Sequence, residues 1–107
     1  TLYAYISENA IKAYAGWMRR CLGELLLNLN DFSQTDTEKW IQQAIESDQE
    51  NGLMLNLAKD YALYADYFRK MGNPQKTCEN LKRAIEIFEE CGADGWVEKY
   101  KEQLAVM

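Results

Sequence analysis

Two stretches of the chain carry one pattern forty residues apart: TEKWIQQAIESDQENG at residues 37–52 and TCENLKRAIEIFEECG at residues 77–92. The alignment pairs Thr37 with Thr77, Ile41 with Leu81, Ala44 with Ala84, Ile45 with Ile85 and Gly52 with Gly92. In both stretches apolar residues recur at three- and four-residue intervals, which predicts an amphipathic helix, and the final glycine predicts its end. The chain therefore contains an internal repeat.

The helices beside these stretches repeat as well. The same offset pairs Tyr64 with Leu104 and Ala65 with Ala105, and a two-residue adjustment in the 30–36 loop aligns Leu22, Gly23 and Leu26 with Tyr64, Ala65 and Phe68. We expect helices near residues 8–29, 36–51, 53–71, 74–91 and 94–105, with Thr35 or Asp36 capping the second and Asn73-Pro74 opening the fourth. Because a two-helix unit buries its apolar face only by stacking on neighbours, residues 1–107 are predicted to form a single all-α domain, an α-α superhelix of antiparallel helices.

The small residues at the expected helix contacts resemble those of the tetratricopeptide repeat (TPR) family. Gly23 and Ala65 match the small position in the family's first helix, and Ala44 and Ala84 match the late small position in its second. The early small position of the second helix instead holds Thr37 and Thr77, and the unit exceeds the usual length of about 34 residues. Residues 80–105 look most like the TPR region at the C-terminal end of large bacterial signalling ATPases, including regulators linked to a nucleotide-cyclase or kinase domain. The resemblance implies a TPR-like solenoid that acts as a protein-interaction and regulatory scaffold.

Charge and composition exclude several classes of protein. The 107 residues carry a net charge of −5, so the basic surface of a nucleic-acid binder is not expected. The sequence contains neither an apolar run long enough for a membrane span nor a recognisable secretory signal. Its three cysteines form no C-x-x-C pair, which favours reduced thiols and a cytoplasmic location. Since the chain opens on threonine, we expect it to be a fragment of a longer protein.

Catalytic machinery is not expected within the chain. There is no histidine, which excludes nucleophiles activated by an imidazole, and the six glycines form no phosphate-binding loop. We interpret the carboxylates around Glu46, Asp48 and Glu50 as a solvated helix face, not as an acid–base pair or cation site. The sequence therefore predicts a non-enzyme with no catalytic residue, cofactor or metal.

The apolar pattern predicts which side chains are buried and which lie at exposed ends. In the first helix we expect a buried stripe of Ile11, Ala15, Met18, Leu22, Leu25 and Leu29. The core aromatic residues are expected to be Trp40, Tyr61, Tyr64, Phe68, Phe88 and Trp96. Exposed apolar surface is expected around Tyr3, Ile6 and Tyr14, or around Val97 and Leu104, where a second copy of the chain can pair.

The TPR resemblance also implies a binding groove, because the first helices of successive TPR units line the concave face. The matched residues are Trp17, Arg20, Glu24, Lys59, Asp66, Arg69, Lys70 and Lys99. Five of them are basic, which favours an acidic protein or peptide, or another domain of the parent chain, as the partner. A homo-oligomerisation scaffold is the nearest alternative, and a small-ligand-binding or catalytic helical domain ranks third.

Overall fold

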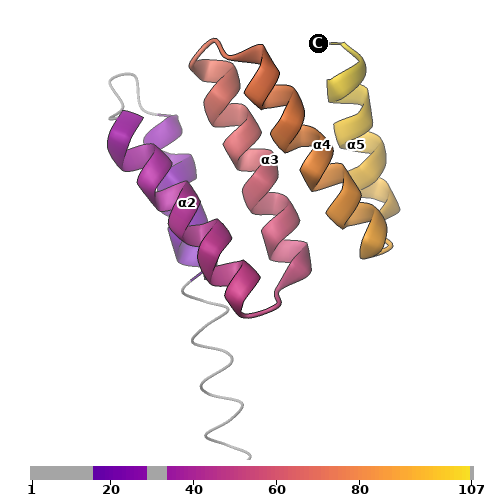
Figure 1. Ribbon diagram of the computed structural model, residues 1–107, viewed down its shortest axis with the longest axis horizontal. Helices are drawn as coiled ribbons and strands as arrows, with labels where there is room; N and C mark the ends of the chain where they lie inside the picture. The colour runs from indigo at the N-terminus through magenta and orange to yellow at the C-terminus, as the bar shows by residue number, and fades with distance from the viewer. Residues whose placement is uncertain (1–15, 29–33, 107) are drawn as a thin grey trace, which may run out of the picture.

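The described part of the protein is entirely helical. The structure, a computed structural model, describes residues 16–28 and 34–106, and those residues contain no strand. A helical segment spans residues 16–27, and it is followed by the helices α2 (Gln34–Glu50), α3 (Met54–Lys70), α4 (Pro74–Glu90) and α5 (Asp94–Ala105). Figure 1 shows the segment behind α2 and the lower part of α5 passing behind α4. The all-helical prediction is therefore confirmed for these residues.

Helix ends fall close to their predicted positions, and two differ for local reasons. α2 begins at Gln34, so Thr35 and Asp36 lie inside its first turn instead of capping it, and the Asp36 carboxylate faces the positive end of the helix dipole. The first helix ends at residue 27, because the Asn28 side-chain amide donates to the Glu24 carbonyl and closes the last turn. Its expected start near residue 8 lies outside the described residues.

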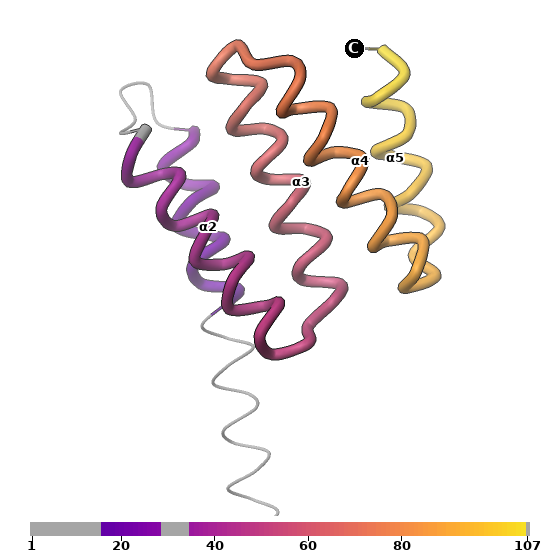
Figure 2. The backbone as a smooth tube through the Cα atoms, viewed as in Figure 1, coloured from indigo at the N-terminus to yellow at the C-terminus, as the bar shows by residue number. Residues whose placement is uncertain are grey.

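Three turns of identical geometry join α2 to α5. Gly52, Gly72 and Gly92 lie twenty residues apart with φ angles of 68°, 74° and 70°, a left-handed conformation that favours glycine. At the first turn the Gly52 N–H donates to the Gln49 carbonyl and the Leu53 N–H donates to the Asp48 carbonyl, which is a Schellman motif. The other two turns repeat both bonds. Figure 2 shows the chain reversing direction at each of them, so successive helices are antiparallel.

The small residues of the repeat lie where the helices pack most closely. Ala44, Ala65 and Ala84 are fully buried, and a Cβ atom added to Gly23 would lie only 2.9 Å from Ile41 Cγ1. Packing joins α2 to α3, α3 to α4 and α4 to α5, so each of these helices contacts its neighbour in sequence. The predicted close contacts are thereby confirmed.

Replacing Gly23 with alanine should lower the free energy of unfolding by about 1 kcal/mol, because the clash with Ile41 outweighs the better helix propensity of alanine. Gly95→Ala is the matched control: its added methyl group meets no atom within 4 Å, so the variant should gain about 0.5 kcal/mol. Urea denaturation measures both values. Changes of the same sign in the free energy of unfolding of the two variants would contradict the close approach at Gly23.

The predicted buried stripe of the first helix is wrong at Met18 and Leu25, whereas its Leu22 is partly buried. Met18 and Leu25 are exposed, Leu25 by 65%, whereas Gly16, Gly23 and Leu27 are buried. The two glycines bring the backbone itself into contact with neighbouring helices, so the packed face lies around them and not along the longer apolar side chains. Ile11, Ala15 and Leu29 lie outside the described residues.

The predictions for the core aromatic residues are confirmed at some positions and wrong at others. Phe68 and Phe88 are buried as expected, Trp96 is exposed by 36%, and Tyr67 is buried although it was not predicted. Of the two alternatives for exposed apolar surface, the C-terminal one is not found at its named residues, since Val97 is buried and Leu104 packs against the same core cluster. Tyr3, Ile6 and Tyr14 lie outside the described residues.

Candidate partner-binding groove

Two adjoining hollows form a groove between the helical segment 16–27, α3 and α5. The first, here called the aromatic hollow, has a volume of about 230 Å³ and is lined by Arg20, Glu24, Lys59, Leu63, Asp66, Trp96, Lys99 and Tyr100. The second, the basic hollow, has a volume of about 360 Å³ and is lined by Glu24, Leu27, Asn28, Leu63, Asp66, Arg69 and Lys70. Glu24, Leu63 and Asp66 line both, so the hollows are continuous.

The aromatic hollow has a rigid wall flanked by positive charge. The Trp96 ring stacks on the buried Phe88 ring at a centroid distance of 5.6 Å and an interplanar angle of 9°. The Nζ atoms of Lys59 and Lys99 lie 5.3 Å and 5.0 Å from the Trp96 centroid, within cation–π range. An exposed indole is thus fixed from the core side and bordered by two ammonium groups.

The basic hollow carries charges that already have partners within the chain. Arg69 contacts the Asp66 carboxylate at 2.8 Å, and Lys70 donates to the Leu27 carbonyl. Burial raises the pKa of Asp66, and the positive charge of Arg69 opposes that increase. Because the Arg69 and Asp66 side chains are each about half exposed, their ion pair contributes little stability and can exchange for another partner.

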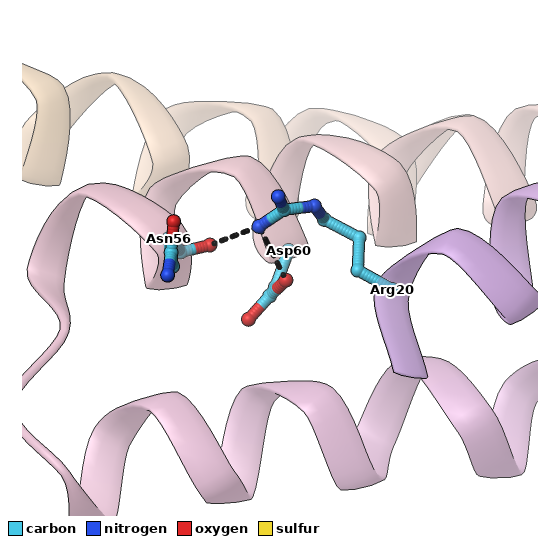
Figure 3. Close-up of polar contacts among 3 residues, drawn as sticks. All are labelled: Arg20, Asn56 and Asp60. Carbon is cyan, nitrogen blue, oxygen red and sulfur yellow. Dashed lines mark hydrogen bonds and ion pairs between the residues drawn. The ribbon is translucent and has the colours of Figure 1, made fainter. Parts of the chain in front are cut away.

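Arg20 is a largely buried side chain that binds α3, and not a free surface charge. Its side chain is only 12% exposed, and its Nη1 atom lies 3.4 Å from both the Asn56 carbonyl oxygen and Asp60 Oδ1 on α3. Figure 3 shows both contacts made by one nitrogen while the other terminal nitrogen points away from Asp60. Arg20 therefore joins the groove to a buried acid.

Asp60 and Asp48 are both fully buried, which is the largest departure from the sequence interpretation. Asp48 was expected on a solvated face, but it lies one turn after the buried Ala44 and shares that face of α2. A Cβ atom added to Gly16 would lie 2.2 Å from Asp48 Oδ1, so the backbone of the segment rests against this carboxyl group. Burial and the hydrogen bond and negative charge of Asp48 raise the pKa of Asp60 to about 9, although Arg20 opposes the increase.

The predicted groove residues divide between the two hollows. Arg20, Glu24, Lys59, Asp66 and Lys99 line the aromatic hollow, and Arg69 and Lys70 join Glu24 and Asp66 in the basic hollow. Trp17 is 47% exposed and lines neither. Sequence reasoning missed Leu63, Trp96 and Tyr100, although Trp96 lies three residues before Lys99 and so shares its helix face.

Another hollow lies outside the groove. It has a volume of about 480 Å³ and is lined by Arg69, Gly72, Asn73, Pro74, Thr77, Gln103 and Val106, beside the α3–α4 turn and the last turn of α5. Its lining contains one predicted residue, Arg69, and little charge. We therefore place the candidate site in the groove, where the predicted residues and the exposed aromatic side chain coincide.

The described residues show neither a cluster of metal ligands nor a helix that could span a membrane. In this part of the chain, no three cysteine, aspartate or glutamate side chains gather as metal ligands. None of the helices described here has the length and apolar character needed to cross a bilayer. Comparison with protein-family models, curated proteins and solved structures found no match.

Proposed function

We propose that this chain is a protein–protein interaction module in which the groove receives an acidic segment of a partner protein or of another domain in the same parent chain. The observation that carries the proposal is the aromatic hollow, where an exposed, rigidly held Trp96 is bordered by Lys59 and Lys99. Tryptophan and arginine are enriched among residues that dominate binding energy, and an exposed aromatic wall in a concave surface suits such an anchor.

Charge within the aromatic hollow supports an acidic occupant. Lys59 and Lys99 border the exposed Trp96 ring, whereas the guanidinium of Arg20 is bound to the buried Asp60. Positive charge is thus concentrated at the Trp96 wall of a chain whose net charge is −5, which favours a carboxylate-bearing segment at that wall. A regulatory scaffold in the cytoplasm, arranged as a TPR-like superhelix, is the biological setting that we propose for this activity.

Charge reversal at the two lysines should weaken partner binding at least about tenfold. In a Lys59→Glu/Lys99→Glu variant the Trp96 wall gains two repelling carboxylates, so association with an acidic segment should slow. A partner is first isolated with the wild-type chain from lysate and then titrated against purified variants by surface plasmon resonance. The wild-type association rate should also fall as salt is raised from 50 to 300 mM.

The matched control places the same charge change on the other helices. Lys39 on α2 and Lys82 on α4 are exposed, so Lys39→Glu/Lys82→Glu has the same net charge as the groove variant. This control should bind with wild-type affinity. Equal affinity for the two double variants would show that the partner does not use the groove.

A homo-oligomerisation scaffold remains a second candidate because one observation favours it. The segment 16–27 exposes Trp17, Met18 and Leu25, an apolar surface on the side away from its packed glycines. Sedimentation equilibrium of the wild type and of Leu25→Ser distinguishes the candidates: a dimer that the serine dissociates supports self-association through this surface.

A further inference from the structure

The contact between the segment 16–27 and the α2–α3 pair is built around two acids and one base. Gly16 and Arg20 come from the segment, Asp48 from α2 and Asp60 from α3. We propose that Asp48 and Asp60 share one proton and thereby act as a latch, so that loss of this proton releases the segment and with it one wall of the groove. The latch is a property of the fold and does not depend on whether the groove binds a partner.

Hydrogen-bonding geometry requires an additional donor at this site. Both oxygens of Asp48 and Oδ2 of Asp60 are buried, and as long as both acids are ionised these oxygens receive no hydrogen bond from the described residues. Leaving three buried carboxyl oxygens without donors is costly, so a proton kept on Asp60 and donated to Asp48 satisfies the pair. Arg20 already donates to the remaining oxygen, Asp60 Oδ1.

Charge balance leads to the same protonation state. Asp48 from α2 and Arg20 from the segment are the charged groups acting on Asp60, and the Asn56 carbonyl on its own helix also binds Arg20. With one proton on the pair, the remaining carboxylate and the guanidinium sum to zero. Without it, two negative charges would face one positive charge in a fully buried site, a state that low-polarity surroundings strongly disfavour.

The segment is the element that can yield to this repulsion. α2 and α3 are joined by the tight turn at Gly52 and pack on each other, whereas Leu27 is the one buried apolar side chain of the segment among its described residues. Local opening occurs preferentially where few apolar contacts hold an element in place. Separation of the segment would expose Asp48, which the Gly16 backbone covers.

Thiol labelling measures this release directly in the intact chain. Cys21 lies on the segment and Cys78 on α4, and both are partly buried. Protection is the ratio of the labelling rate in urea to the rate in buffer at the same pH, which cancels the intrinsic ionisation of the thiols. We expect the protection of Cys21 to fall at least about tenfold more than that of Cys78 between pH 6 and pH 10.

Two conservative variants separate the latch from ordinary unfolding. Asp60→Asn and Asp48→Asn each remove one negative charge and supply an amide donor, so either should keep Cys21 protected at pH 10. In the wild type alone, constant protection of Cys21, or an equal loss at Cys21 and Cys78, would overturn the proposal whether or not the variants fold. If a folded variant loses Cys21 protection as the wild type does, the proposal is likewise overturned.

Discussion

Replacing Ala84 with leucine is expected to lower the free energy of unfolding by about 1–3 kcal/mol. Ala84 is fully buried in the cluster that joins α3, α4 and α5, so three added carbons must displace neighbouring side chains of that cluster. The close approach of the helices depends on the absence of a longer side chain there. Chemical denaturation followed by far-UV circular dichroism measures the loss.

The control makes the same substitution where the chain is open. Ala105 lies exposed in the last turn of α5, so Ala105→Leu should change the free energy of unfolding by less than about 0.5 kcal/mol. Equal denaturation midpoints for the two leucine variants would show that Ala84 is not a close-packing site.

Stability should fall as the pH is raised from 5 to 8. The pKa of Asp60 is raised in the folded protein from 3.8 to about 9, so the folded chain keeps a proton that the unfolded chain releases. The contribution of this proton to the free energy of unfolding is complete below pH 3.8 and is lost progressively up to about pH 9. Over this range the free energy of unfolding falls by at most about 1.4 kcal/mol per pH unit. The raised pKa of Asp66 acts in the same direction.

Asp60→Asn isolates this effect because asparagine mimics the protonated acid at every pH. The variant and the wild type should have similar stability near pH 4, and the variant should be the more stable by roughly 2 kcal/mol or more at pH 8. Asp94→Asn, at the exposed start of α5, should retain the wild-type slope. Parallel curves for the wild type and Asp60→Asn would contradict the assignment of the proton to Asp60.

The repeat made much of the fold predictable, because its signals are local. A glycine in the left-handed region ends a helix wherever it stands, and Asn73 caps α4 by accepting the Lys76 N–H as its position before Pro74 predicted. An alanine that recurs at one position of the repeat indicates a close contact between helices, even when the partner helix is not known. These features depend on the chain within one turn of the residue concerned.

The buried acids could not be recognised in the same way. Asp48 lies between Glu46 and Glu50, and this acidic stretch is typical of a solvated helix end, although its spacing of four residues from Ala44 places it on the packed face. What makes its burial tolerable is Asp60 on another helix and Arg20 on a third. The first helix was misjudged for a related reason: its glycines, with no side chain to count as apolar, form its packed face.

The three identical turns also determine how the surface can change in length. Each of α2, α3 and α4 occupies twenty residues together with the turn that follows it, so duplication of forty residues adds one helix to the groove face and one to the opposite face. Duplication of twenty residues would instead move every later helix from one of these two faces to the other. The groove can therefore lengthen only in whole two-helix steps, and its length increases by discrete increments.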